Sequence, residues 1–263
     1  MITSTANGKV KRLINLKKKR KLRDEEHVFL VEGIRMFREV PVDELQEVYV
    51  SESFYKKEKV LVNAIAGQAG VHIEVLTDTV FAHASDTKTP QGVLCVVRQK
   101  SYKLEDLLKG EKRHLLVLDN LQDPGNMGTI VRTAEGAGVT GVIMSRDCVD
   151  IYNPKTIRSI YRMPFYYAED ILKAIRKIKD AGIKVYAAHL DGEKSYDEED
   201  YAFSCAFLIG NEGNGLREET SKMADHYIII PMSGEVESLN AAIAASVLMF
   251  EVKRQRRNTE KNS

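Results

Sequence analysis

The stretch between residues 205 and 251 constrains the fold more than any other part of this sequence. Residues 205–209 form a short apolar run, which is typical of a strand buried on both faces of a sheet. Residues 210–216 follow as a loop rich in glycine and asparagine, in which the backbone can come close to a ligand. Residues 227–230 predict a second buried strand, and another polar loop follows it. Two such loops after two buried strands indicate a ligand site at one edge of a sheet.

A helix is predicted after the second polar loop, and Ser238 is a natural N-cap for it. Apolar residues then recur at helical spacing, so we expect one face of this helix to be buried. The residues expected on that face are Leu239, Ala242, Ile243, Ser246, Val247 and Phe250.

The rest of the chain alternates predicted strands with predicted helices, and the larger domain begins with a strand at residues 114–118. This alternation predicts an α/β fold with a parallel sheet covered on both faces. A smaller α/β domain is expected before it. The expected organisation is an N-terminal domain with a basic leader (1–98), a charged linker (99–113), the larger domain (114–257) and a polar tail (258–263).

The formal net charge is only +1 over 263 residues, but the charges are unevenly placed. Lysine and arginine crowd residues 9–23, and the C-terminal helix ends in basic residues. Such clusters favour polyanions such as nucleic acids, although a solvated tail would have the same composition. Every apolar stretch is shorter than the roughly 18 residues that span a membrane, and the N-terminus lacks a signal-peptide core. We therefore expect a cytoplasmic protein.

Three common kinds of site do not fit the polar loops. The glycine-rich loop lacks the Lys-Ser or Lys-Thr pair of a phosphate-binding P-loop, and Glu212 within it would repel phosphate. The loop at residues 120–128, after the first strand of the larger domain, lacks the GxGxxG pattern of a dinucleotide site. The histidines and the three cysteines are scattered without metal-ligand spacing, so no metal site is expected.

What remains at the predicted sheet edge is a set of neutral amides and hydroxyls with one basic residue, Arg132. Arg132 lies off the apolar face of the helix predicted at residues 127–137, so its side chain can point toward a site. The alternative is a surface residue paired with Glu135. The neutral polar residues are Asn120, Asn126, Asn211, Asn214, Ser238 and Asn240.

Three motifs occur in one order along the second half of the chain. The first occupies residues 120–128 and continues through Arg132 to Gly138, the second occupies residues 210–216, and the third spans residues 230–242. Together they resemble the SpoU (TrmH-like) family of RNA ribose 2′-O-methyltransferases, within the SPOUT superfamily. The resemblance covers about residues 112–257.

Residues 8–98 also resemble a known part of that family, its N-terminal substrate-binding domain. The resemblance rests on the basic run at residues 17–23 and on the Phe-Leu-Val-Glu-Gly sequence at residues 29–33. This domain is similar in fold to ribosomal proteins that bind RNA. It implies RNA as the partner and ribosomal RNA as the substrate, with transfer RNA as the alternative.

The resemblance implies a C-terminal SPOUT domain with a deep trefoil knot, and S-adenosylmethionine bound at the knot. Gly210, Ile230 and Leu239 match the positions that contact this cofactor, largely through backbone groups. The resemblance also implies a homodimer, with neither a membrane nor a metal as a partner.

The same resemblance places Arg132, Asn126, Glu212, Ser238 and Asn240 at the catalytic centre. Arg132 would be a general base, or a guanidinium that binds the flanking phosphate and stabilises developing charge; arginine stays protonated, which favours the second role. Asn126 would orient Arg132 or the ribose, and Glu212 would fix both side chains or shape the cofactor pocket. Ser238 would face the ribose while capping its helix. Asn240 would offer an amide to the substrate or to the knot.

Two other functions remain open at this point. A non-catalytic RNA-binding or ribosome-assembly factor could keep the fold, although such a protein would usually have lost at least one of the five candidate residues. Methylation of a base on the same scaffold is the other, although the Asn, Arg and Ser set favours a ribose. No short protein motif predicts the target nucleotide, because RNA specificity depends on loop shape and splayed bases.

Overall fold

The computed structural model describes residues 1–85, 87–154, 156–157, 163–189, 192, 194–234 and 238–261. The chain forms two compact units. The first consists of Met1–Lys100 with Tyr152–Tyr161, and the second of Ser101–Ile151 with Arg162–Ser263. Among the helices that are described, none is long and apolar enough to span a membrane.

The first unit contains a four-stranded sheet in the order β1-β4-β2-β3. β4 is antiparallel to both β1 and β2, whereas β2 and β3 are parallel. The strands are β1 (Val28–Glu32), β2 (Leu45–Ser51), β3 (Ile73–Leu76) and β4 (Val93–Arg98). The helices are α1 (Gly8–Lys18), α2 (Arg20–Glu26), α3 (Ile34–Glu39), α4 (Glu52–Ala69) and α5 (Asp78–Ala84).

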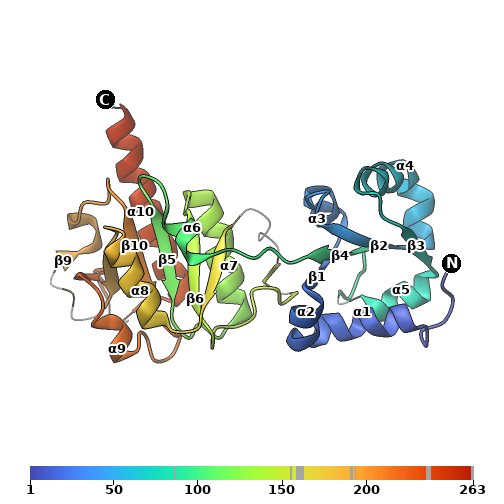
Figure 1. The fold of residues 1–263 in the computed structure, drawn as a ribbon, viewed down its shortest axis with the longest axis horizontal. Helices are drawn as coiled ribbons and strands as arrows, with labels where there is room; N and C mark the ends of the chain where they lie inside the picture. The colour runs from blue at the N-terminus through green and yellow to red at the C-terminus, as the bar shows by residue number, and fades with distance from the viewer. Residues whose placement is uncertain are drawn as a thin grey trace. The chain divides into compact units, whose positions relative to one another are not determined.

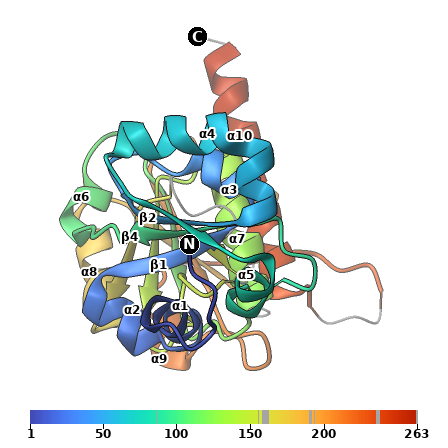
Figure 2. The same ribbon diagram turned by 90° about the vertical axis from the view of Figure 1, so that its right-hand side faces the viewer.

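The basic leader is an integral part of this unit. α1 and α5 bury their apolar side chains against one face of the sheet, and α3 and α4 contact the strands on the other (Figure 2). The Arg23 side chain is only 4% exposed and donates to the carbonyl oxygen of Lys17 at 3.1 Å. Arg12 donates to the carboxylates of Glu26 and Glu47. Part of the basic cluster is therefore used to hold the unit together.

The second unit contains a seven-stranded sheet in the order β7-β6-β5-β10-β8-β11-β9, and every neighbouring pair is parallel (Figure 1). The strands are β5 (His114–Leu118), β6 (Gly141–Ser145), β7 (Phe165–Ala168), β8 (Lys184–Ala188), β9 (Lys194–Ser195), β10 (Cys205–Ile209) and β11 (His226–Ile229). The helices are α6 (Leu104–Leu108), α7 (Pro124–Ala137), α8 (Ile171–Asp180), α9 (Glu218–Ser221) and α10 (Ala241–Lys261), with a 3-10 turn η2 (Tyr196–Glu198). The predicted α/β fold with a parallel sheet is confirmed.

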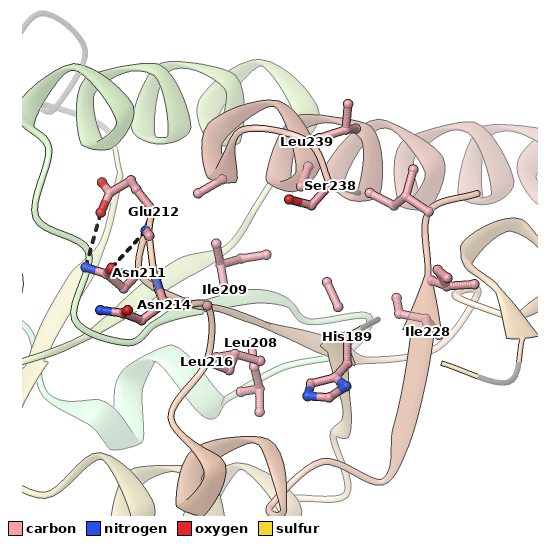
Figure 3. Close-up of a pocket in the computed structure, with 18 residues that line it drawn as sticks. His189, Leu208, Ile209, Asn211, Glu212, Asn214, Leu216, Ile228, Ser238 and Leu239 are labelled. Carbon is pink, nitrogen blue, oxygen red and sulfur yellow. Dashed lines mark hydrogen bonds between the residues drawn. The ribbon is translucent and has the colours of Figure 1, made fainter. Parts of the chain in front are cut away.

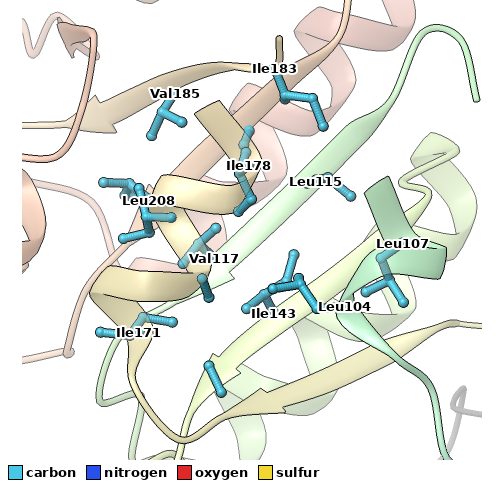
Figure 4. Close-up of a cluster of buried hydrophobic side chains, with 14 of the residues drawn as sticks. Leu104, Leu107, Leu115, Val117, Ile143, Ile171, Ile178, Ile183, Val185 and Leu208 are labelled. Atoms are coloured by element: carbon cyan, nitrogen blue, oxygen red, sulfur yellow. The ribbon is translucent and has the colours of Figure 1, made fainter. Parts of the chain in front are cut away.

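Helices cover both faces of this sheet, as the alternation predicted. α6 and α8 pack on one face, where Leu115, Val117 and Leu208 project from the strands (Figure 4). The alternate strand residues face the other side, where α7 and α10 lie in contact with each other. The sequence placed α6 within a linker at residues 99–113. Its leucines instead belong to the core of the second unit.

The connection between β6 and β7 contributes to the first unit, which the sequence did not predict. The ring of Tyr152 stacks on that of Phe29 with 4.6 Å between centroids. Its hydroxyl accepts a hydrogen bond from the backbone N–H of Lys100 at 3.2 Å. The first unit is therefore built from two separate stretches of the chain.

The start of the last helix and its buried face differ from the prediction. α10 begins at Ala241, and the side-chain oxygen of Asn240 accepts from the backbone N–H of Ala242 at 2.9 Å. Asn240, and not Ser238, caps this helix. Ile243 and Phe250 were expected to be buried, but each is 49% exposed. Ala242 is buried as predicted, and the rest of the buried face is formed by Ala245, Leu248, Met249 and Val252.

Candidate functional site

A pocket of about 390 Å³ lies at the carboxyl ends of β8, β10 and β11 (Figure 3). The glycine-rich loop at residues 210–216 forms one wall, and the segment that enters α10 lies opposite His189 and Leu208. The three residues predicted to bind a cofactor, Gly210, Ile230 and Leu239, all line it. The other lining residues are Ala188, His189, Leu208, Ile209, Asn211, Glu212, Gly213, Asn214, Gly215, Leu216, Ile228, Ile229, Ser238, Ala241 and Ala244.

The glycine-rich loop closes on itself. Asn211 and Gly215 exchange backbone hydrogen bonds of 2.8 and 2.9 Å. A Cβ atom at Gly210 would collide with backbone atoms of Gly215 and Leu216. Gly215 itself has a φ of +68°, which favours glycine. Glycine at position 210 is thus required by the close approach of two backbone segments, and not only by the approach of a ligand.

The side chain of Asn211 holds this loop in shape. Its oxygen accepts from the backbone N–H groups of Gly213 and Asn214 at 2.9 and 3.1 Å. Its amide nitrogen donates to the carbonyl oxygen of Asn120 at 2.9 Å. Because Asn120 follows β5, Asn211 joins the loops at the ends of two neighbouring strands.

Glu212 connects the glycine-rich loop to the N-terminus of α7. Its carboxylate accepts from the backbone N–H groups of Gln122 and Asp123 at 3.1 and 2.8 Å, and from the Asn126 side chain at 3.1 Å. Burial opposes ionisation, but the N–H of Asp123, the Asn126 amide and the N–H of Gln122 outweigh it and hold the pKa of Glu212 below its ordinary value. Glu212 is therefore an ionised acceptor near neutral pH.

Asn126 brings the three sequence motifs into contact. Its side-chain nitrogen donates to Glu212, and its side-chain oxygen accepts from the Asn240 amide at 3.1 Å. Its backbone N–H donates to Asp123, the N-cap of α7, at 2.7 Å. One residue from each of the three motifs, Asn126, Glu212 and Asn240, is therefore joined in one hydrogen-bonded network.

The remaining two candidates lie outside this network. Ser238 lines the pocket but makes no side-chain hydrogen bond within the described part of the chain. Arg132 is exposed on α7 and does not line the pocket. Its guanidinium has no ion pair or hydrogen bond among the residues that the structure describes, and the surface pair with Glu135 does not form there.

Sequence reasoning missed a charged group behind the glycine-rich loop. Asp119 follows β5 directly and is fully buried, and its carboxylate pairs with Arg217. His189 was also missed; it lines the pocket with its ring stacked on Tyr227 at 5.0 Å. A carboxylate at the end of a fully apolar strand run was a signal that could have indicated Asp119. His189 lay in no motif.

Two family models cover most of the chain. The SpoU rRNA Methylase family matches residues 113–250. The MRM3-like substrate binding domain matches residues 7–95. In the described residues, no group of three His, Cys, Asp or Glu side chains could hold a metal ion.

Relatives of known name align with nearly the whole chain. The 23S rRNA (guanosine(2553)-2′-O)-methyltransferase RlmP of Bacillus subtilis is 29% identical over 96% of this chain and 98% of its own. An AdoMet bound rRNA methyltransferase from Sinorhizobium meliloti has a TM-score of 0.85 at 30% identity, covering 96% of this chain and 97% of that one. The SpoU methyltransferase AviRb from Streptomyces viridochromogenes has a TM-score of 0.82 at 25% identity, covering 96% and 99%. With its motifs in contact and more than half of its length matched by one family model, this chain belongs to the SpoU rRNA methylase family.

Proposed function

We propose that this protein is an S-adenosylmethionine-dependent methyltransferase that methylates a ribose 2′-hydroxyl in ribosomal RNA. The observation that carries the proposal is the network of Asn126, Glu212 and Asn240 beside the pocket at residues 210–216. The relatives named as rRNA and 2′-O-methyltransferases support the same reaction.

The pocket fits the chemistry of S-adenosylmethionine. Its volume of about 390 Å³ lies in the usual range for small-molecule sites, and Leu208, Leu216 and Ile228 give it apolar walls. The described lining residues include neither lysine nor arginine, so a phosphate-bearing ligand lacks a strong cationic partner while a sulfonium is not repelled by one. Backbone groups of Gly210, Ile230 and Leu239 would hold the cofactor, which supplies an electrophilic methyl group when bound.

The polar network would position the ribose. N–H donors occupy both oxygens of Glu212, and its lowered pKa makes it a weak base, so it acts as a fixed anchor and not as the proton acceptor. Asn126 and Asn240 hold each other in one orientation, which limits the entropy lost when a substrate binds. Ser238, whose hydroxyl lines the pocket, would face the same ribose.

Arg132 would complete this centre with RNA present. Its exposed guanidinium has no partner among the described residues and is therefore available to an RNA phosphate. A guanidinium so bound would also stabilise negative charge that develops on the 2′-oxygen. Because arginine keeps its proton, we propose this electrostatic role in place of general-base catalysis.

We propose residues 1–98 as the RNA-binding domain and residues 114–257 as the methyltransferase domain. Lys11, Lys18 and Lys19 are exposed in the basic leader, whereas Arg12 and Arg23 are committed to internal contacts. The match of residues 7–95 to a substrate binding domain supports this division. With ribosomal RNA as its substrate, the protein would act in the cytoplasm.

We also propose that the protein is a homodimer with a trefoil-knotted C-terminal domain. Ile243 and Phe250 lie two turns apart on α10 and leave an apolar face half exposed. A second copy of the chain would bury that face, as symmetric oligomers commonly do. The knot stays a prediction from family membership.

Labelled methyl transfer tests the proposed substrate. S-adenosylmethionine would be incubated with the protein and with ribosomal or transfer RNA, each purified from a strain that lacks the gene. We expect label in ribosomal RNA alone. Label in transfer RNA alone would move the activity to that substrate, and bound cofactor without transfer to either would favour a substrate present only during ribosome assembly. Absence of both binding and transfer would favour the non-catalytic factor.

A further inference from the structure

One ion pair lies directly behind the glycine-rich loop. Asp119 is fully buried, and Arg217 lies two residues after the last glycine of the loop. The guanidinium Nε atom donates to both carboxylate oxygens of Asp119, at 3.0 and 3.1 Å, and Nη2 pairs with the same carboxylate. The carboxylate of Asp147 accepts from Nη1 at 3.2 Å. The single planar guanidinium of Arg217 thus pairs with two carboxylates.

This guanidinium joins the ends of three adjacent strands. Asp119 follows β5, Asp147 lies just after β6, and Arg217 follows β10 at the end of its loop. The three strands are neighbours in the sheet, in the order β6-β5-β10. The ion pair therefore fixes the position of the C-terminal end of the glycine-rich loop relative to these three strands.

The near end of the same loop is held by different contacts. Glu212 bonds to the N-terminus of α7, and Asn211 bonds to the carbonyl of Asn120. The loop backbone between these contacts and Arg217 forms one wall of the pocket. A wall that is fixed at both ends cannot shift without breaking one set of contacts.

We propose that Arg217 is a positioning residue for the cofactor wall, acting through Asp119. This inference rests on the proposed function, because it assigns Arg217 an effect on binding of S-adenosylmethionine. Arg217 does not line the pocket and makes no direct contact with the cofactor space. Its influence comes from the place where it holds residues 210–216.

The burial of Asp119 determines the sign of the expected effect. Removing only Arg217 leaves a buried carboxylate without its cation, and burying such a charge is strongly unfavourable. The surrounding loops would move to bring water or another donor to Asp119. Removing both charges leaves no such demand, so a double neutral variant should disturb the loop less than the single one.

The test measures the dissociation constant of S-adenosylmethionine by isothermal titration calorimetry with the full chain. The variants are Arg217→Gln, Arg217→Lys and the double variant Asp119→Asn with Arg217→Gln. The matched control is Arg146→Gln. Arg146 directly follows β6 and forms an exposed ion pair with Glu169, which directly follows β7. Thermal midpoints are recorded for every protein, so that binding is compared well below unfolding.

We expect Arg217→Gln to raise the dissociation constant by about tenfold or more, as for other groups that fix a binding geometry. The dissociation constant of Arg217→Lys should lie between those of Arg217→Gln and the wild type. Lysine keeps the positive charge but lacks the planar set of N–H donors of a guanidinium. The double variant should bind more tightly than Arg217→Gln, and Arg146→Gln should match the wild type.

The contrary outcomes are separable. A lowered thermal midpoint for Arg217→Gln with unchanged affinity would show that the pair only stabilises the fold, and the positioning role would be wrong. A double variant as weak as the single one would contradict the mechanism through Asp119. A wild-type protein that does not bind S-adenosylmethionine at all would overturn the proposed function and this inference with it.

Discussion

At the level of single residues, the candidate side chains divide into a preorganised network and one arginine outside it. Asn126, Glu212 and Asn240 are bonded to one another before any ligand binds. Arg132 lies beyond that network, exposed on α7. This division predicts that the network governs geometry and that Arg132 governs the chemical step.

Arg132→Ala should reduce turnover by at least about 100-fold, because it removes a charge that acts mainly in the transition state. Binding of S-adenosylmethionine should stay within about twofold, since Arg132 does not line the pocket. Single-turnover methyl transfer and calorimetry measure the two quantities. Arg146→Ala, an exposed arginine in the same unit, is the control. Preserved turnover in Arg132→Ala would contradict its catalytic role.

Glu212 predicts a pH dependence of stability. Its folded-state pKa is lowered, so its contribution is present above the unfolded pKa of about 4.3 and is lost as the pH falls through the folded value. Thermal midpoints of the wild type and Glu212→Gln should therefore differ most at neutral pH and converge only as the pH falls below the lowered folded-state pKa of Glu212. A difference that stays constant from pH 7 to pH 3 would show that the charge of Glu212 does not stabilise the fold.

The polar loops at the ends of buried strands predicted where the site lies, whereas its cofactor positions came from the resemblance to the family. Gly210, Ile230 and Leu239, which that resemblance named, line the pocket. The pairing of Asp119 with Arg217 could not be predicted, because their proximity depends on β10 entering the sheet beside β5. No local sequence pattern predicts that β5 and β10 are neighbours in the sheet.

At the level of secondary structure, short apolar runs between polar segments predicted strands such as β5 and β10, whereas β9, a Lys-Ser pair, contains no such run. The helix boundaries were less certain where several residues could serve as caps. Ser238 and Asn240 are both good N-cap residues. The contact of the Asn240 amide with Asn126, a tertiary interaction, accompanies the start of α10 at Ala241. A local propensity cannot distinguish the two positions.

This assignment of the cap can be measured. Asn240→Ala should lower the stability of the protein by about 1 kcal/mol, the usual effect of losing an N-cap side chain. Ser238→Ala should change it by less than about 0.5 kcal/mol, as for most exposed substitutions. Urea unfolding of the two variants and the wild type provides the comparison. A larger loss in Ser238→Ala than in Asn240→Ala would return the cap to Ser238.

At the level of the whole molecule, the sequence predicted two α/β units and did not predict how the chain is shared between them. Residues 99–113 were predicted to be a linker because they are highly charged and contain only a short apolar patch. Leu104 and Leu107 of that patch are buried in the second unit. Tyr152 joins the first unit from a distant part of the chain. Both features depend on packing between residues far apart in the sequence, which local periodicity does not predict.

The apolar face of α10 predicts the oligomeric state. Light scattering should give the mass of a dimer for the wild type, because Ile243 and Phe250 would be covered by a second copy. Replacing both with lysine should produce monomers, since a desolvated charge at an interface is costly. Val60→Lys, at an exposed apolar site in the first unit, is the matched control. A monomeric wild type that is fully active would contradict the proposed dimer.

The central claim is that the methyl group goes to a ribose hydroxyl. Ribosomal RNA from a strain lacking the gene would be treated with the protein and S-adenosylmethionine, digested to nucleosides and analysed by mass spectrometry. We predict one new nucleoside whose added 14 Da stays with the sugar fragment, consistent with the neutral amide, hydroxyl and guanidinium groups gathered at this site. It should be absent with Arg132→Ala. A methyl group that stays with the base fragment would contradict this account of the site.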